Sequence, residues 1–302
     1  MLTHQHPAPV HPSRVVVIGA GGFVGGTIVK QLSLANVPTL ALTRKQVNLL
    51  APNAAESLAA LLRRDDAVVF VSAVAPAKNV AQLMTNLRMA EAVCAAVAAV
   101  PPAHLLYISS DAVYADDANP VTERSPVAPS TTHGMMHAAR ELMLRSEYRG
   151  PLAFLRPTLI FGAEDPHSGY GPNRFRRQAA KGEPITIFGE GEERRDHIAV
   201  EDVARLAVLI LLHRSAGALN AVTGVATSFH DIAQIVAAQF SPHADVKSVP
   251  RPGPRPHLLH RFFDITEMNK VFPEFHPEPL AVALVRVHGE GRAAAVSGNL
   301  AS

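Results

Sequence analysis

VVVIGAGGFVGG, residues 15–26, joins a short apolar run to a glycine-rich turn. The run from Val15 to Ile18 has the β-branched, apolar character of a buried strand. Gly19, Gly22 and Gly25 follow it in a G-x-x-G-x-x-G register, and the residues after them predict a helix.

A strand, glycine turn and helix in this order can bind a pyrophosphate. Glycine lets the backbone turn sharply and approach the phosphates, and the helix N-terminus offers unpaired N–H groups and a positive dipole. A turn that binds no ligand is the structural alternative, but the strand–turn–helix context favours a dinucleotide. We assign its expected contacts to Gly19, Gly22, Phe23, Val24 and Gly25.

Strand and helix patterns alternate through the first half of the chain. Strand patterns cover Val15–Ile18, Thr39–Leu42, Ala67–Ser72, His104–Ser109 and Ala153–Ile160. Helical patterns cover Thr27–Leu34, Ala54–Arg63, Val80–Ala99 and Met135–Ser146. Strands separated by helical crossovers predict an α/β fold with a doubly wound, parallel, Rossmann-type sheet, which we place in residues 14–165.

The sequence changes character after Gly162, where proline and glycine recur. A basic helix (Arg174–Lys181), a hairpin-like segment (Ile185–Gly191), helices at Val200–Leu212 and Phe229–Phe240, and a loop at 251–256 are expected. We therefore predict a smaller, mixed C-terminal substrate-binding domain over residues 166–287, with some segments returning to the sheet. Residues 1–13 and 288–302 are expected to be flexible tails.

Composition limits the classes of protein to which the chain can belong. The single cysteine, Cys94, excludes an internal disulfide and suggests a reducing compartment. The net charge of +2 gives no argument for nucleic acid, and no apolar stretch has the character of a membrane span. We expect a cytoplasmic protein that binds neither nucleic acid nor membranes.

The cofactor can be narrowed from the residues after the second strand. No acidic residue occurs between Gly25 and Glu56, so the carboxylate that grips the ribose diol in NAD-binding folds is missing. Arg44 and Lys45 stand there instead, and an arginine can bind the 2′-phosphate of NADP; a solvated basic pair is the alternative. NADP is therefore favoured over NAD, with Ser72 as a further expected contact.

Segments along nearly the whole chain resemble the extended short-chain dehydrogenases/reductases, specifically the NAD(P)-dependent epimerase/dehydratase family that modifies nucleotide sugars. They are IGAGGFVG (18–25), YISSDAVYA (107–115), LRPTLIFG (155–162), GPNRFRRQAAKGEPITIFGEGEERRDHIAVEDVA (171–204), VTGVATSFHDIA (222–233) and FDITEMNKVF (263–272). LTRKQVNLL (42–50) is similar to the NADPH-dependent ketosugar reductase/epimerase branch. The resemblance implies an oxidoreductase or epimerase acting on a nucleotide-linked sugar, and a possible homodimer.

The resemblance places Ser110, four residues before Tyr114, at the catalytic Ser/Thr position, where its hydroxyl would bind the reacting oxygen of the substrate. A simple helix cap is the structural alternative for this serine. Asp111 matches the general acid of the sugar 4,6-dehydratases and is a candidate catalytic residue. Those enzymes have glutamate next, and this chain has Ala112, so we do not assign a dehydration.

The family's Tyr-x-x-x-Lys pair is replaced in this chain. The alignment of THGMMHAARE, residues 132–141, puts His133 at the tyrosine position and His137 at the lysine position. In the family the tyrosine is the acid/base, and the lysine lowers its pKa and holds the nicotinamide ribose.

Three hypotheses follow from this replacement. In the first, His133 exchanges the proton, since an unperturbed imidazole has a pKa of about 6.5, and His137 binds the ribose. In the second, the protein is a catalytically silent relative that binds dinucleotide and nucleotide sugar as a sensor or partner subunit. In the third, the two histidines, four residues apart on a helix, hold a metal, which would need a third ligand; we assign no metal.

The second domain would bind the nucleoside diphosphate. By position in the family, Asn173 and Arg195 contact the diphosphate and Phe188 stacks on the base, although a core role for Phe188 is nearly as well supported. Asp196 matches a residue that ties down its loop. Arg174, Arg176 and Arg177 form either a solvated face or a basic face beside the diphosphate.

Overall fold

The computed structural model describes residues 1–251, 253 and 259–299, and the chain forms two compact units. The first unit comprises Met1–Thr158, Glu201–Ala221 and Ile265–Phe275. The second comprises Leu159–Val200, Val222–Asp264 and His276–Ser302. The chain thus leaves the first unit after Thr158 and returns to it twice. The sequence prediction has its main boundary at residue 165, with some later segments returning to the sheet.

A six-stranded parallel sheet forms the centre of the first unit. Its strands are β1 (Val15–Ile18), β2 (Thr39–Leu42), β3 (Ala67–Phe70), β4 (His104–Ile108), β5 (Leu152–Pro157) and β9 (Gly217–Ala221). They lie in the order β2-β1-β3-β4-β5-β9, so the direction of winding reverses beside β1. This confirms the predicted doubly wound sheet.

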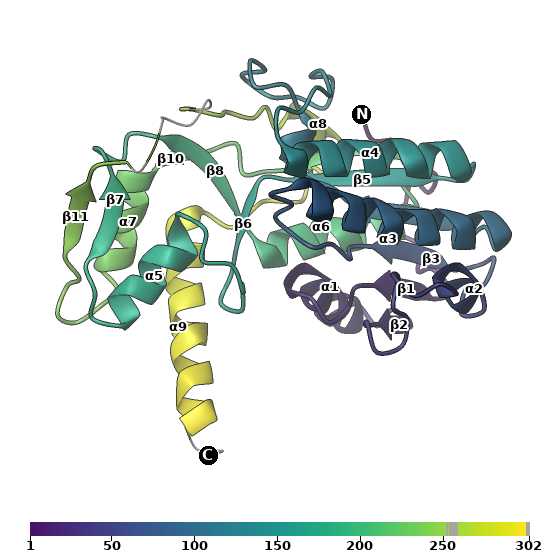
Figure 1. Cartoon of the computed structure of the whole chain (residues 1–302), viewed down its shortest axis with the longest axis horizontal. Helices are drawn as coiled ribbons and strands as arrows, with labels where there is room; N and C mark the ends of the chain where they lie inside the picture. Colours follow the sequence, from purple (N-terminus) through teal and green to yellow (C-terminus); the bar gives the residue numbers. More distant parts are fainter. Residues whose placement is uncertain (252, 254–258, 300–302) are drawn as a thin grey trace. The chain divides into compact units, whose positions relative to one another are not determined.

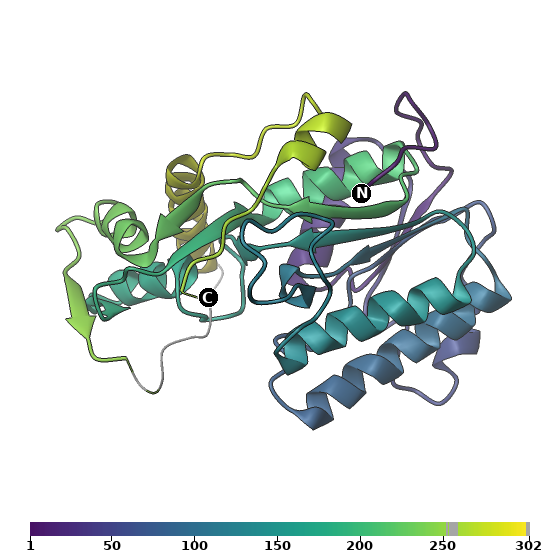
Figure 2. The ribbon, with the colours of Figure 1, turned by 90° about the horizontal axis from the view of Figure 1, so that it is seen from above.

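Helices cover both faces of this sheet, as Figure 2 shows, with α3 and α4 side by side on one face and α1 and α6 on the other. The helices of the first unit are α1 (Phe23–Leu34), α2 (Ala54–Ala59), α3 (Val80–Ala99), α4 (Thr132–Glu147), α6 (Val200–Leu212), whose first residue belongs to the second unit, and α8 (Thr266–Val271). A 3₁₀ turn, η1 (Asp111–Val113), follows β4.

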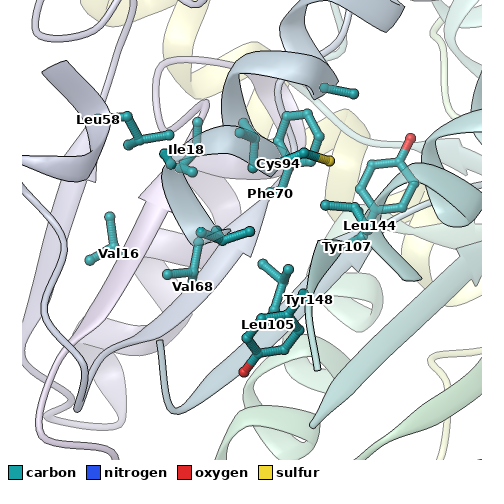
Figure 3. Close-up of a cluster of buried hydrophobic side chains, with 14 of the residues drawn as sticks. Val16, Ile18, Leu58, Val68, Phe70, Cys94, Leu105, Tyr107, Leu144 and Tyr148 are labelled. Carbon is teal, nitrogen blue, oxygen red and sulfur yellow. The ribbon is translucent and has the colours of Figure 1, made fainter. Parts of the chain in front are cut away.

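The core explains why the strands appear in the sequence as apolar runs. Strands β1, β3 and β4 are covered on both faces and bury every side chain, so polar residues do not alternate with apolar ones. Figure 3 shows part of the cluster beneath α2, α3 and α4, which includes Phe70 of β3, Tyr107 of β4 and Leu144 of α4. Cys94 is a buried free thiol in this cluster, and burial raises its pKa to about 11.

The second unit has two small sheets. Strands β6 (Leu159–Phe161), β8 (Arg194–Ala199) and β10 (Ala226–Ser228) form one, and β7 (Ile185–Phe188) and β11 (Val246–Val249) form the other. The helices are α5 (Pro172–Ala180), α7 (Phe229–Ala237) and α9 (Leu280–Asn299), all labelled in Figure 1. The expected hairpin at Ile185–Gly191 is absent, because β7 pairs in parallel with β11, far along the chain.

Both expected tails differ from the structure. Leu2 is buried, Thr3 pairs with Ala216, and His4 hydrogen-bonds the Ser215 hydroxyl and the Val271 carbonyl. The first residues therefore lie along the edge beside β9, because one apolar side chain and an available strand edge hold them. At the other end, residues 288–299 continue helix α9, where the run Ala293–Ala295 consists of the residue type with the strongest helix propensity. Residues 300–302 lie outside the described part.

Candidate active site

The expected cofactor residues gather at one edge of the six-stranded sheet. Gly19 follows β1, Arg44 lies two residues beyond β2, Ser72 two residues beyond β3, and Ser110 two residues beyond β4. The strands are parallel, so all these positions lie at their carboxyl ends. Ligands of open α/β sheets bind at this edge, where the winding reverses.

The glycine turn has the close contacts that exclude side chains. A Cβ atom at Gly25 would lie 2.1 Å from the Gly19 carbonyl oxygen, and Gly19 itself has φ +107°. Gly22 is the N-cap of α1 and makes no side-chain capping bond, so the first N–H groups of this helix are available to an anion. The turn therefore fits the pyrophosphate of a dinucleotide, with Phe23 and Val24 half-buried in its first helical turn.

Ser72 packs directly against the glycine turn. A Cβ atom at Gly19 would lie 2.6 Å from its hydroxyl oxygen and 2.8 Å from its backbone nitrogen. Its N–H donates to the Ile18 carbonyl at 3.0 Å, so this serine extends β3 alongside β1. The expected cofactor residue thus lies beside the turn that would hold the phosphates.

The turn after β2 carries two exposed cations, Arg44 and Lys45. The Thr43 hydroxyl hydrogen-bonds the Gln46 side chain and accepts the N–H of Lys45 at 3.3 Å. A Cβ atom at Gly21 would lie 3.4 Å from the Thr43 methyl group, so this basic turn adjoins the glycine turn.

Ser110 caps the short turn η1 after β4. Its hydroxyl accepts the N–H of Ala112 at 3.1 Å and lies 3.3 Å from an oxygen of Asp111. The helix cap that the sequence left as an alternative is thus present, and the hydroxyl is half-buried at the same time. Both expected residues, Ser110 and Asp111, lie at the carboxyl end of β4.

His133 lies in the first turn of α4, against the turn η1. A Cβ atom at Gly134 would lie 2.0 Å from the Ala112 carbonyl oxygen, so only glycine lets α4 start there. The Ala77 N–H donates to Nδ1 of His133 over a long 3.4 Å, which leaves the proton of the neutral ring on Nε2. Burial lowers the pKa of His133 below its ordinary 6.5, so the imidazole is neutral at pH 7.

His137 lies one turn further along α4 and is buried. Its Nδ1 and the hydroxyl of Tyr107 in β4 are 2.7 Å apart, and its ring lies edge-to-face with that of His133, with 4.8 Å between centroids. Burial holds the pKa of His137 well below 6.5, helped by the charges of His133 and Arg140. The Nδ1 atom of His137 is thus engaged inside the unit, and Nε2 is the ring nitrogen that remains to bind a ligand.

A buried polar network lies beside these residues. Glu141 of α4 accepts the Ser109 hydroxyl at 2.7 Å and binds the Arg156 guanidinium with both oxygens, at 2.8 and 2.5 Å. Arg156 also donates to the Tyr114 hydroxyl at 2.9 Å, and Tyr114 donates to Asn220 at 2.7 Å. The network joins α4 to β4, β5 and β9, and so fixes the backbone that carries Ser110.

In the second unit, Phe188 is half-exposed and already stacked. Its ring lies 4.6 Å from that of Tyr170, and the guanidinium carbons of Arg174 and Arg251 lie 5.6 and 5.5 Å from its centroid. An aromatic pair flanked by cations suits a planar base next to phosphates. The sequence did not predict these roles for Tyr170 and Arg251, because neither residue lies in a segment that resembles the family.

Asn173 lies in the first turn of α5 and is buried. Its amide nitrogen donates to Asp165, and its Oδ1 has no hydrogen-bond partner. His197 of β8 is also buried and has an unpartnered Nε2; burial lowers its pKa to about 4. Within the second unit, a Cβ atom at Gly171 would lie 3.5 Å from that nitrogen, so His197 and the start of α5 are adjacent.

The arginines of the second unit have separate roles. Arg195 donates to the Leu259 carbonyl at 2.7 Å, and Asp196 accepts the N–H groups of Thr223 and Gly224, as expected for a residue that ties down a loop.

Arg176 donates to the Val287 and Ala163 carbonyls at 2.9 Å. Arg177 donates to Asp165 and His167 carbonyls, so these two arginines form neither a solvated face nor a free phosphate clamp.

The described residues contain neither a metal-binding cluster nor a helix that could span a membrane. No group of three or more His, Cys, Asp or Glu side chains there is arranged to hold a metal ion, so the third ligand that the metal hypothesis requires is not found. No helix in the described part of the chain has both the length and the apolar character needed to cross a membrane.

Comparison with known proteins identifies the family of these segments. The sequence model of the NAD dependent epimerase/dehydratase family matches residues 15–224. A dTDP-4-dehydro-6-deoxy-D-allose reductase of Streptomyces bikiniensis is 31% identical over 149 residues. That alignment covers 47% of this chain and 44% of the reductase, so the chain spans less than half of the length of this relative.

Solved structures extend the likeness over the whole fold. A UDP-glucose 4-epimerase of Thermotoga maritima, solved with UDP-glucose, has a TM-score of 0.81 at 20% identity, covering 93% of this chain and 99% of its own. A GDP-L-fucose synthetase of Naegleria fowleri, bound to NADP, has a TM-score of 0.81 at 15% identity, covering 96% and 97%. At these identities the likeness shows a shared fold.

Proposed function

The chain belongs to the NAD-dependent epimerase/dehydratase family, and we propose that it is an NAD(P)-dependent oxidoreductase or epimerase of a nucleotide-linked sugar in which His133 replaces the acid/base tyrosine. The observation that carries the proposal is the arrangement at the start of α4. His133, neutral and half-buried, lies there against the turn that carries Ser110, at the same sheet edge as the glycine turn.

The first unit would hold the dinucleotide. The N–H groups at the start of α1 would bind the pyrophosphate, and the Nε2 of His137 would donate to the nicotinamide ribose. A bound nicotinamide supplies or accepts the hydride of such a reaction. For the choice of dinucleotide, exposed Arg44 and Lys45 beside the Thr43 turn favour the extra phosphate of NADP.

His133 and Ser110 would act on the oxygen that changes oxidation state. Ser110 would donate its hydroxyl to this oxygen, at the cost of its own 3.3 Å contact with Asp111. His133 presents Nε2–H in the neutral form, and protonation at Nδ1 requires that the 3.4 Å bond from Ala77 is given up. That bond is long and weak, so both protonation states are within reach.

The second unit would bind the nucleoside diphosphate. Phe188, already stacked on Tyr170 and flanked by Arg174 and Arg251, suits a base with an adjoining phosphate. The amide nitrogen of Asn173 donates to Asp165, so the buried Oδ1, which only accepts, is the atom that remains for a ligand. It would accept a hydrogen bond from a ligand hydroxyl more readily than it would contact a phosphate. Arg195 would bind phosphate only after leaving the Leu259 carbonyl.

Ligand stabilisation tests the substrate class. Ligands that bind only the folded protein raise its melting temperature, so UDP, GDP or dTDP and their sugars should do so at millimolar concentration. Arg195→Ala should abolish this shift and keep the shift with dinucleotide. Arg194→Ala, an exposed neighbour in β8, is the matched control and should keep both. The substrate class is wrong if no nucleoside diphosphate stabilises the native protein.

A catalytically silent binding protein is the second candidate. This candidate is favoured because Nδ1 of His137 is hydrogen-bonded to the Tyr107 hydroxyl, so only Nε2 of His137 remains for a ligand. This candidate predicts binding of dinucleotide and nucleotide sugar without turnover on any sugar, and binding that His133→Ala leaves unchanged.

We further expect a homodimer in the cytoplasm. Helices α3 and α4 leave large apolar side chains exposed, among them Val80 at 68% and Leu142 at 69%. Leu142→Glu should shift a dimer towards monomer in analytical ultracentrifugation, and Leu34→Glu, 68% exposed on α1, should not. A native monomer would contradict this expectation. The free, buried Cys94 suits a reducing compartment.

A further inference from the structure

His197 is a buried histidine of the second unit for which the proposed function has no role. It lies in β8 (Figure 1), the middle strand of the sheet β10-β8-β6, and is 3% exposed. Its Nδ1 lies 3.3 Å from the carbonyl oxygen of Arg195, and because a carbonyl only accepts, the ring proton is on Nδ1. The neutral imidazole then has an acceptor at Nε2, and this buried atom has no hydrogen-bond partner in the described part of the chain.

The first turn of α5 lies against this nitrogen. Gly171 is the N-cap of α5, and a Cβ atom there would lie 3.5 Å from Nε2 of His197 and 3.3 Å from the Phe229 ring. Among the described residues no side chain caps this helix end. Pro172 at the next position has no N–H, so Asn173 is the first residue of α5 whose backbone can donate there. The imidazole acceptor therefore adjoins a helix end that has backbone donors.

Asn173 brings a second buried acceptor to the same helix end. Its amide nitrogen donates to Asp165, and its Oδ1 has no partner among the residues that the structure describes. A buried acceptor without a donor destabilises the free protein, and a ligand that supplies the donor removes that cost. Two such atoms at one helix end therefore indicate a ligand group that donates hydrogen bonds.

A hydroxyl group fits these atoms, and a phosphate does not. The oxygens of a diphosphate are acceptors at neutral pH, as are Nε2 of His197 and Oδ1 of Asn173. Protonation of His197 would turn Nε2 into a donor, but burial lowers its pKa to about 4, so the ring is neutral at pH 7. A hydroxyl can donate its proton to one of the two acceptors, and its oxygen can accept a backbone N–H from the start of α5.

The aromatic rings of the second unit connect His197 to the proposed nucleotide site. His197 and Arg195 are two residues apart in β8, so their side chains lie on the same face of the strand. The Phe229 ring contacts His197 edge-on, with 5.6 Å between centroids. The same ring lies 4.5 Å from that of Tyr170, which stacks on Phe188. The two acceptors therefore lie on the side of the unit where the nucleotide would bind.

We propose that His197 is a specificity-determining residue, whose Nε2 accepts, together with Oδ1 of Asn173, the hydroxyl groups of a nucleotide sugar bound in the second unit. The inference rests on the proposed function, which supplies the nucleotide sugar. The hydroxyls come from the ribose or from the sugar, and both sources present the same chemistry.

Binding at this place requires a local movement and creates a preference. Both acceptors are shielded from solvent, so the first turn of α5 moves apart from β8 when the ligand binds. A ligand that lacks the hydroxyl leaves Nε2 of His197 buried and unpaired, so it binds more weakly than a ligand that has the hydroxyl.

Isothermal titration of the full chain with UDP, 2′-deoxy-UDP and UDP-glucose, or with the same three ligands of the base that binds best, tests the proposal. If the ribose supplies the hydroxyl, the native protein should bind UDP roughly tenfold more tightly than 2′-deoxy-UDP. If the sugar supplies it, the native protein should bind UDP-glucose roughly tenfold more tightly than UDP. His197→Phe, which keeps a ring and removes the acceptor, should abolish that preference.

Two further variants accompany this measurement. His197→Gln, whose amide oxygen can accept, should retain the preference. His243→Phe, the same change at an exposed position of the second unit, is the matched control and should bind as the native protein does. The ratio of affinities decides the result, because a general loss of structure weakens all three ligands alike.

The proposal is overturned if the native protein shows neither preference, if His197→Phe keeps the native preference, or if His197→Phe and His197→Gln behave alike. If His197→Phe does not fold, His197→Met, with a flexible apolar side chain, is measured by the same criteria. A native protein that binds none of the ligands contradicts the proposed function and the inference with it, whereas a native preference that survives in His197→Phe contradicts the inference alone.

Discussion

The hydroxyl of Tyr107 lies 2.7 Å from Nδ1 of His137, and both side chains are buried. The resemblance places a lysine at this position of α4, and a flexible ammonium there would reach out to a ribose. The imidazole is instead anchored inward, to a strand of the sheet. Its position no longer depends on the ligand, and this has consequences for stability as well as for binding.

His137→Ala should lower stability and weaken the binding of dinucleotide together. The substitution leaves the Tyr107 hydroxyl buried without its partner, which costs about 1–3 kcal/mol, besides removing the ribose contact. Denaturant unfolding and dinucleotide titration measure the two effects. Combined with Tyr107→Phe, the loss of stability should be smaller than the sum of the single losses, because both changes remove the same bond. Simple additivity would contradict the coupling of these residues.

Arg44→Ala should narrow a preference for NADPH over NADH. The side chain is exposed at the end of β2, where it can pair with the 2′-phosphate, and the chain lacks an acidic residue there to bind the ribose diol. Titration of both dinucleotides against the native protein and the variant measures the change. Lys30→Ala, which removes an exposed cation from α1, should preserve the preference. Equal affinities in the native protein would remove the argument for NADP.

Stability should fall as the pH falls below about 6.5, with His104 as one cause. Burial lowers the pKa of His104 to about 4, and its Nε2–H donates to the Ser215 carbonyl at 2.7 Å. In the unfolded chain His104 takes up a proton near pH 6.5, whereas in the folded chain it does so only near pH 4. Its contribution to the free energy of unfolding is therefore fully present above about pH 6.5 and is lost as the pH falls towards about 4.

A single variant isolates this effect. His104→Gln should reduce the loss of unfolding free energy between about pH 7.5 and about pH 5 by on the order of 2 kcal/mol. His243→Gln, at an exposed position, should leave the pH dependence as it is in the native protein. The same slope in all three proteins would contradict a lowered pKa of His104 in the folded state.

The sheet could be predicted because its strands are buried on both faces. Val15–Ile18, Thr39–Leu42 and Val80–Ala99 have the same bounds in sequence and structure. The pairing of β7 with β11 could not be predicted, since no local pattern marks two strands so far apart in the chain. The strand expected over Ala153–Ile160 divides at Thr158, where the chain passes from the first unit to the second.

The candidate site was predictable where its residues follow strand ends. The glycine turn can be located from the alternation of strands and helices. The helix was predicted to begin at Met135, whereas α4 begins at Thr132, and His133 was placed by the resemblance to the family. Tyr107 was missed for a physical reason, because in sequence a tyrosine in an apolar run resembles core. Its role arises from a contact between β4 and His137 of α4 that only the folded chain makes.

The rate of nicotinamide oxidation or reduction with a panel of nucleotide-linked sugars, compared between the native protein and His133→Ala, tests the account most directly. The native protein should turn over at least one such sugar. The variant should be slower by roughly 10²–10⁴-fold at almost unchanged dinucleotide affinity. Because burial lowers the pKa of His133, the native rate should titrate below pH 6.5, with reduction favoured on the acid side and oxidation on the alkaline side. Turnover that survives in His133→Ala at the native rate, or no turnover of any sugar by a native protein that binds both ligands, would contradict the account.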